Sequence, residues 1–484
     1  MSTDGFQKDF TEKVLKLFEE INSIPRCSGN EKAIGDWLID LGKKQGWDTI
    51  QDEVMNVILK VPGKGEFADK EAIVLQGHLD MVCVKDEGST HDFTNDPIEI
   101  FQEDGWLRTK DTTLGADNGI AIAISLAIAL EKSISHPPLE LLFTSDEERG
   151  LTGAKGLKPG ILKAKYLINI DSEDEGVFTI GCAGGKNVYI EIPLVYEENS
   201  TKNDCYELSI TRLSGGHSGI QIIENKPNAI KLAADIINNV ATHTEIFNLC
   251  SIKAGVAHNA IPTNAVIGFS CPNESLVKVI VNQLIDDLEK DVRPYEPNME
   301  VSFKKVISCE KFIATDISKK TLNMLMELPD GVFCMSKEMP DIVETSNNLA
   351  QIDISENKIE VLLSLRSSIA SQIDLLSDMI KKIATDADAI FTIDEGYPTW
   401  QPDWTSQILE KSKISYNNIF VKEPIIEVIH AGLECGVIGA KYPGMQMISI
   451  GPTVKSPHTT REKLKIDDIN KIIWFLLELF KNLG

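Results

Sequence analysis

A histidine and an aspartate two residues apart, His78 and Asp80, follow the apolar run 72–75 in the segment QGHLD. On an extended chain, side chains two residues apart point to the same side. The imidazole could bind a metal ion, while the carboxylate accepts a hydrogen bond from the second ring nitrogen and fixes its tautomer. Taken alone, this pair fits an ordinary loop histidine better than a metal ligand.

Four further acidic residues occupy comparable places along the chain. Glu147 and Glu148 come just after the apolar run 139–144, and Asp171 directly follows the run 166–170. Asp117 precedes the apolar segment 119–130, at a helix N-terminus that favours negative charge. Acidic loops are usually solvated, but solvation does not explain why these acids follow buried strands. Because ligands of open α/β sheets bind at the carboxyl ends of strands, the pattern predicts a ligand site there.

The elements that would position these residues alternate between helix-like and strand-like patterns. Helical spacing of apolar residues occurs in 10–21 and 31–41, and the segment 119–130 is apolar nearly all round, as in a buried helix. Short runs without polar alternation occur at 72–75, 139–143 and 166–170. Buried strands separated by helices predict an α/β sheet with helices on both faces.

The middle of the chain has a different order of elements. Its patterns predict a strand at 205–212, a helix at 227–240, strands at 249–255 and 265–270, a helix at 274–288 and a strand at 299–305. This β-α-β-β-α-β order is that of a ferredoxin-like unit. A similar set follows between residues 321 and 393, which suggests a second copy. We therefore predict an α/β domain, residues 1–183 and 397–484, interrupted by an inserted α+β domain, residues 184–396.

Composition excludes several classes of partner. The 484 residues carry a formal charge of −25, which argues against binding nucleic acid or anionic lipid. No run of 18 apolar residues occurs, so no membrane span is expected. The nine cysteines are spread singly without a CxxC pair, which predicts reduced thiols and a cytoplasmic location.

Five motifs in order, GHLDMV, TTLGADNGIAIA, FTSDEERGLTGA, INIDSE and SPHTTREKL, closely resemble the M20 family of co-catalytic zinc peptidases. Together with the opening SIPRCSGNE and the long insert, the whole chain resembles the aminoacyl-histidine dipeptidase branch of that family. The resemblance implies a mixed-sheet α/β/α catalytic domain, with the insert serving as a lid and dimerisation domain.

The resemblance also implies two zinc ions per subunit, with Co²⁺ or Mn²⁺ as alternatives. Asp117 would bridge the two ions. His78 and Asp171 would complete one site, and Glu148 and His458 the other. Each ion would then have three protein ligands and an open position, as catalytic zinc sites do.

Glu147 is left without a metal in this scheme, which fits a general base that moves a proton from the shared water to the leaving amine. Asp80 would orient His78. The resemblance also places a cis peptide bond between Asp117 and Asn118.

Three residues of the insert match family positions that contact the substrate. His217, in the glycine-rich segment SGGHSG, would stabilise the oxyanion, and Asn259 and Arg366 would hold the terminal carboxylate. Without the resemblance, Asn259 and Arg366 read as a turn asparagine and a surface arginine, and His217 fits either interpretation.

The resulting prediction is a dizinc metallopeptidase that hydrolyses dipeptides with a free N-terminus, including Xaa-His dipeptides such as carnosine. Its partners would be a small peptide substrate and a second copy of the chain in a homodimer. The alternatives are an aminoacylase or tripeptidase on the same scaffold, or a non-catalytic protein that binds peptide or metal. Retention of Glu147 beside five ligand-type residues argues against the last.

Overall fold

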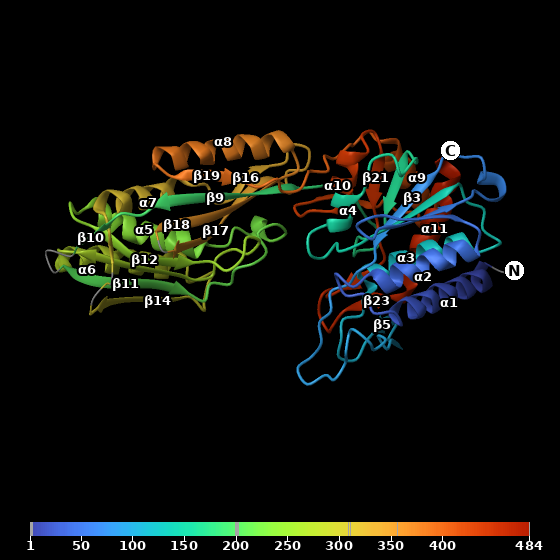
Figure 1. The fold of residues 1–484 in the computed structure, drawn as a ribbon, viewed down its shortest axis with the longest axis horizontal. Helices are drawn as coiled ribbons and strands as arrows, with labels where there is room; N and C mark the ends of the chain where they lie inside the picture. Colours follow the sequence, from blue (N-terminus) through green and yellow to red (C-terminus); the bar gives the residue numbers. More distant parts are fainter. Residues whose placement is uncertain (1–2, 199–202, 308, 310, 356, 484) are drawn as a thin grey trace. The chain divides into compact units, whose positions relative to one another are not determined.

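The computed structural model describes residues 3–198, 203–307, 309, 311–355 and 357–483 (Figure 1). The chain forms two compact units. Unit 1 contains residues 1–182, 400–429 and 433–484, and unit 2 contains residues 183–399 and 430–432. Residues 183, 397–399 and 430–432, which we expected in the α/β domain, lie in unit 2. The reason is local: Tyr397 and Gly185 exchange backbone hydrogen bonds, and the His430 ring bonds to Ser346.

Unit 1 is built on an eight-stranded sheet with the order β1-β2-β6-β3-β7-β21-β8-β20. Strands β6, β3, β7 and β21 run parallel in the middle of the sheet. Their residues are buried almost throughout, which explains the apolar runs in the sequence. The strands are β1 (Asp48–Gln51), β2 (Val57–Val61), β3 (Ile73–His78), β6 (Leu139–Thr144), β7 (Tyr166–Asn169), β8 (Val177–Cys182), β20 (Ile425–Ile429) and β21 (Gln446–Ser449).

Helices cover both faces of this sheet. The missing side chain of Gly77 in β3 leaves room for helix α3, whereas its neighbour Gln76 points to the opposite face and bonds to Glu434 at the start of α10. The predicted α/β/α layers are therefore confirmed. The helices are α1 (Thr3–Asn22), α2 (Lys32–Lys44), α3 (Ala116–Leu130), α4 (Thr152–Gly156), α9 (Gln407–Phe420), α10 (Glu434–Lys441) and α11 (Ile466–Asn482). A small separate sheet contains β4 (Phe101–Glu103), β5 (Trp106–Arg108), β22 (Val454–Lys455) and β23 (Lys463–Lys465).

Unit 2 contains one long antiparallel sheet with the order β14-β11-β13-β12-β17-β18-β9-β19, and β16 (Gly331–Met335) pairs with β17. Its strands are β9 (Gly184–Pro193), β11 (Asp204–Thr211), β12 (Asn248–Ala254), β13 (Ala265–Cys271), β14 (Glu300–Val306), β17 (Val343–Ser355), β18 (Lys358–Ser367) and β19 (Ile390–Ile393). Helices α5 (Ala229–Thr242), α6 (Glu274–Asp291), α7 (Thr315–Glu327) and α8 (Ala370–Asp386) contribute to the core of this unit. A two-stranded ribbon joins β10 (Tyr196–Glu197) to β15 (Phe312–Ile313).

The insert is a duplicated ferredoxin-like sheet, as predicted, but its copies are not consecutive. Strands β11, β12, β13 and β14 form one copy, with the spatial order fourth-first-third-second. The other copy contains β9, β17, β18 and β19, and the same order runs in the opposite direction along the sheet. The two copies meet where β12 pairs with β17. The first strand of the second copy, β9, therefore precedes the whole first copy. Because the first copy is inserted between β9 and the rest of the second copy, the order of elements along the sequence does not show the full repeat.

The expectation of reduced thiols is wrong for one pair, because Cys27 and Cys83 form a disulfide. The backbone of Met81 donates to the carbonyl of Arg26, and this pairing brings the two cysteine Cα atoms to 5.7 Å. The other seven cysteines are free. Among the described residues, no helix combines the length and the apolar character needed to cross a membrane.

Candidate functional site

The predicted ligand residues of unit 1 come together at the carboxyl ends of its central strands. His78 is the last residue of β3, Glu147 and Glu148 follow β6, and Asp171 follows β7. These three strands are neighbours and run parallel, so their carboxyl ends meet at one edge. Asp117 reaches the same place from the first turn of α3.

Asp117 lies between two histidines that are 380 positions apart in the sequence. Its Oδ1 is 3.0 Å from His78 Nε2, and its Oδ2 is 3.1 Å from His458 Nε2. His78 Nε2 is also 3.6 Å from Asp171 Oδ1, and His458 Nε2 is 3.0 Å from Glu148 Oε1. All five predicted ligands therefore converge, with one oxygen of Asp117 on each side.

The donor set suits divalent metal ions. Among the described residues, three groups that contain predicted ligands have their ligand atoms within 4.8 Å of one another: His78 with Asp117 and Asp171, Asp117 with Glu148 and His458, and His78 with Glu147 and Glu148. Imidazole nitrogens and carboxylate oxygens are the ligands that zinc and related ions take in catalytic sites. The residues present therefore fit a pair of metal ions that share Asp117.

Electrostatics points the same way. Burial among other carboxylates raises the pKa of Asp171 well above its usual range and that of Glu147 to about 8. Hydrogen bonds to Asp117 and Glu148 raise the pKa of His458 to about 11. The buried cation Arg26 bonds to backbone carbonyls and to Asn22, not to these carboxylates. Such a buried excess of negative charge is favourable only when a cation or bound protons compensate it.

Asp80 holds two parts of the site at once. Its Oδ1 is 3.3 Å from His78 Nδ1 and accepts a hydrogen bond from the backbone N–H of Glu147 at 3.0 Å. Its Oδ2 accepts from the N–H of Glu148 at 3.3 Å and from the hydroxyl of Ser28 at 2.8 Å. His78 Nδ1 also lies 3.1 Å from the backbone carbonyl of Asp80, so this one residue contacts both the His78 ring and the Glu147-Glu148 turn.

Asn118 joins α3 to the strands beside it. Its side-chain oxygen accepts from the backbone N–H of His78 at 3.1 Å, and its amide donates to the carbonyl of Ile170 at 2.8 Å. The Asp117-Asn118 peptide bond is cis, which confirms the expectation drawn from the resemblance.

Two buried glutamates near this cluster were missed by the sequence analysis. Glu434 Oε2 accepts from Gln76 Nε2 and from Thr144 Oγ1, both at 2.6 Å. Glu462 accepts hydrogen bonds from the backbone N–H groups of residues 114–117, at the start of α3. The sequence places Glu462 four residues after His458, which could have suggested a role near the site. Its hydrogen-bond partners, however, lie some 345 residues away in sequence, so the pattern did not indicate them.

Unit 2 has its own cluster of polar side chains, centred on Arg366. Arg366 is buried in β18, and its Nη1 donates to the hydroxyl of Tyr397 at 2.8 Å. Burial, and after it the positive charge of Arg366, lower the pKa of the histidines His217, His258 and His430. A buried guanidinium beside neutral imidazoles is suited to an anion such as a carboxylate.

His217 has a defined tautomer when neutral. Its Nδ1 accepts hydrogen bonds from the backbone N–H groups of Gly219 at 3.0 Å and Ile220 at 3.2 Å. The ring proton must therefore lie on Nε2, which makes that atom a hydrogen-bond donor. Asn259 lies beside this turn, where its carbonyl accepts from Ser218 N at 2.8 Å.

His430 belongs to the same cluster and was not predicted. Its Nε2 lies 2.7 Å from the hydroxyl of Ser346, which neighbours Arg366 across the β17–β18 pair. Burial lowers the pKa of His430 to about 3, so it is neutral at pH 7. The pattern that led to His78, a polar residue at the end of a strand, also applies to His430, which directly follows strand β20.

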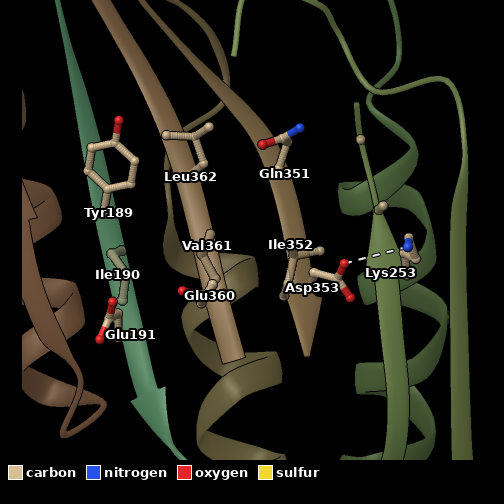
Figure 2. Close-up of a pocket in the computed structure, with 12 residues that line it drawn as sticks. Tyr189, Ile190, Glu191, Lys253, Gln351, Ile352, Asp353, Glu360, Val361 and Leu362 are labelled. Carbon is tan, nitrogen blue, oxygen red and sulfur yellow. Dashed lines mark ion pairs between the residues drawn. The ribbon is translucent and has the colours of Figure 1, made fainter. Parts of the chain in front are cut away.

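A separate groove crosses the outer face of the unit 2 sheet (Figure 2). It is lined by residues of β9, β17, β18 and β12, including Tyr189, Glu191, Leu362 and Gln351, and Lys253 pairs with Asp353 at 3.6 Å. None of the predicted site residues lies among its lining residues.

Comparison with known proteins agrees with this geometry. In sequence, the chain is 34% identical over 471 residues to the cytosol non-specific dipeptidase of Escherichia coli (strain K12), and the match covers 96% of each chain. In structure, it is similar to aminoacylhistidine dipeptidase from Vibrio alginolyticus, with a TM-score of 0.90 and 35% identity over 98% of this chain and 96% of that one. Aminopeptidase PepT from Bacillus cereus, at 15% identity, a TM-score of 0.57 and 98% coverage of each chain, shares the fold.

The family model described as peptidase family M20/M25/M40 matches residues 74–482. This segment contains the five converging residues of unit 1 and the Arg366 cluster of unit 2. The resemblance noted in the five motifs is thereby confirmed, and the chain is a peptidase that belongs to family M20/M25/M40.

Proposed function

We propose that the protein is a metal-dependent dipeptidase that uses two divalent ions, zinc in the first instance, and requires a free N-terminus on its substrate. The observation that carries this proposal is the placement of Asp117, with one carboxylate oxygen near His78 and the other near His458. A carboxylate in that position can bridge two ions. Asp171 on one side and Glu148 on the other complete three ligands for each ion.

Two bound divalent ions would act as Lewis acids that make a water molecule more acidic and polarise the scissile carbonyl. Glu147 belongs to neither three-ligand group around Asp117, yet its carboxylate lies within 4.8 Å of His78 and Glu148 ligand atoms. Glu147 would therefore take the proton of the attacking water and deliver it to the leaving amine. Asp80 holds Glu147 in place through the backbone N–H.

Unit 2 would supply the groups that recognise the rest of the dipeptide. Arg366 would pair with the terminal carboxylate together with Asn259, and the Nε2–H of His217 would donate to the oxyanion. The tautomer of His217 supports this role, because backbone N–H groups occupy its other nitrogen. The family resemblance further supports a homodimer, and the name of the E. coli relative supports a cytoplasmic location.

The names of two relatives, a non-specific dipeptidase and an aminoacylhistidine dipeptidase, support dipeptides as substrates, including those that end in histidine, such as carnosine. A panel of Xaa-His dipeptides, other dipeptides, tripeptides and N-acetyl amino acids, assayed with protein of known metal content, tests this. We expect hydrolysis of free dipeptides, with tripeptides and N-acetyl amino acids at least tenfold slower. Preferred cleavage of tripeptides would make it a tripeptidase, and preferred cleavage of N-acetyl amino acids an aminoacylase.

A further inference from the structure

Glu462 places its carboxylate against four consecutive backbone N–H groups of unit 1. Its Oε2 accepts from Leu114 N at 2.8 Å and Gly115 N at 3.0 Å. Its Oε1 accepts from Ala116 N at 2.8 Å and Asp117 N at 3.3 Å. The side chain is 3% exposed, so water does not compete for these bonds.

The local backbone explains why an anion is needed there. Gly115 adopts a left-handed conformation, with φ of 69°, immediately before α3. The first N–H groups of a helix have no partner within the helix and attract negative charge. A single carboxylate satisfies all four groups and thereby fixes the path of the chain into Asp117.

Arg26 holds the same loop from another direction. Its Nη2 donates to the carbonyl of Gly115 at 2.5 Å, and its Nη1 donates to the carbonyls of Leu79 and Asp80 at 3.1 Å each. The loop before Asp117 is thus held by a carboxylate on its N–H groups and by a guanidinium on a carbonyl.

Glu462 also belongs to the segment that carries His458. Its own backbone N–H donates to the carbonyl of Thr459 at 3.1 Å, closing a turn directly after the histidine. The turn and the carboxylate together connect two ligand-bearing segments that are 345 residues apart in sequence.

We infer that Glu462 is a positioning residue for the metal centre, which sets Asp117 against His458 and so determines how tightly the site that includes Glu148 holds its ion. This inference rests on the proposed function, since it requires that the cluster binds metal. Hydrogen-bond partners behind metal ligands typically change metal affinity by about 10- to 100-fold when they are removed.

The test is a Zn²⁺ titration of the full chain against a chromophoric chelator, comparing wild type with Glu462→Gln. The amide nitrogen of Gln cannot accept hydrogen bonds, so two of the four N–H groups lose their acceptor while the side-chain volume is kept. We expect one of the two zinc equivalents to bind about 10- to 100-fold more weakly, and excess zinc to restore part of the lost kcat with little change in KM.

Glu140 offers a matched control in the same unit. It is also buried, and it accepts hydrogen bonds from the backbone N–H groups of Lys163 and Ala164 at 2.9 to 3.1 Å, but it contacts no ligand of the cluster. Glu140→Gln should lower the unfolding temperature and leave zinc affinity unchanged. An equal loss of zinc affinity in both variants, or wild-type affinity in Glu462→Gln, would overturn the inference.

Should Glu462→Gln not fold, Glu462→Asp decides the question. It retains the charge but shortens the reach, so we expect zinc binding weakened several-fold, and wild-type binding would refute the positioning role. A wild-type chain that binds no zinc would refute the proposed function itself, which separates the two failures.

Discussion

In unit 1, four carboxylates and two imidazoles meet at the ends of parallel strands. In unit 2, one guanidinium on an antiparallel sheet lies near three imidazoles from the loops beside it. The pKa values of the histidines differ between the two units. The pKa values of His78 and His458 are raised by neighbouring carboxylates, and those of His217 and His430 are lowered by burial and by Arg366. One residue type thus occurs in opposite surroundings: the unit 1 cluster is suited to cations, and the unit 2 cluster is suited to anions.

The largest effect is expected at Glu147, the acid of unit 1 that we propose for proton transfer and not for metal binding. Glu147→Gln removes the base and keeps the volume, so kcat should fall by about 10²- to 10⁴-fold. Metal content should stay at the wild-type value, because Glu147 belongs to neither three-ligand group around Asp117. Steady-state kinetics with metal analysis of the same sample checks both. Loss of metal would make Glu147 a ligand.

The disulfide adds a covalent tie to unit 1 alone. Cys27 and Cys83 are separated by 56 residues, and a loop of that length is expected to contribute about 4 kcal/mol to the free energy of unfolding. Thiol titration in denaturant should count seven thiols before reduction and nine after it. Reduction, or the Cys27→Ser/Cys83→Ser variant, should lower the unfolding temperature of unit 1. Nine thiols in unreduced protein would contradict this.

Arg366 is the residue of unit 2 that we propose to bind the terminal carboxylate of the substrate. Arg366→Ala should lower kcat/KM for a dipeptide by roughly 10- to 100-fold, the value of a hydrogen-bonded charge pair, and leave metal content unchanged. A dipeptide with an amidated C-terminus provides the matched control, because it lacks the carboxylate. Wild type should discriminate against it, and Arg366→Ala should not. An equal loss of kcat/KM on both peptides would show that Arg366 does not bind the terminal carboxylate.

His430 gives the smallest expected effect. Its pKa is about 3 in the folded protein against 6.5 when unfolded, so below pH 6.5 the unfolded state takes up a proton that the folded state does not. The free energy of unfolding should fall by about 1.4 kcal/mol per pH unit from this source, or about 2 kcal/mol by pH 5. Denaturant unfolding in chelator should show a shallower pH dependence for His430→Gln. Equal slopes would mean that His430 is not buried as a neutral ring.

The sequence predicted what depends on local pattern. Apolar runs identified β3, β6 and β7, and the polar residues after each of them led to His78, Glu147 and Asp171. It did not predict the nesting of β9 ahead of its own ferredoxin-like copy, because a linear reading assumes that partner strands follow one another.

Nor did it predict the contacts made by side chains far apart in the chain. The Cys27–Cys83 bond depends on backbone pairing beside Arg26 and Met81, which no spacing encodes. The bond from Glu462 to the loop before Asp117 depends on N–H groups, which every residue other than proline carries. His430 was overlooked because strand β20 includes a glutamate and is only partly buried, so its apolar run is weak.

The metal stoichiometry of the purified chain tests the central claim most directly. After dialysis against zinc and then against metal-free buffer, elemental analysis should find two zinc ions per chain in the wild type. Asp117→Asn, which removes the charge that the two proposed ion sites would share, should retain fewer than one, whereas Arg366→Ala should retain two. Fewer than two ions in the wild type, or two in Asp117→Asn, would contradict the assignment of a shared two-metal site to unit 1.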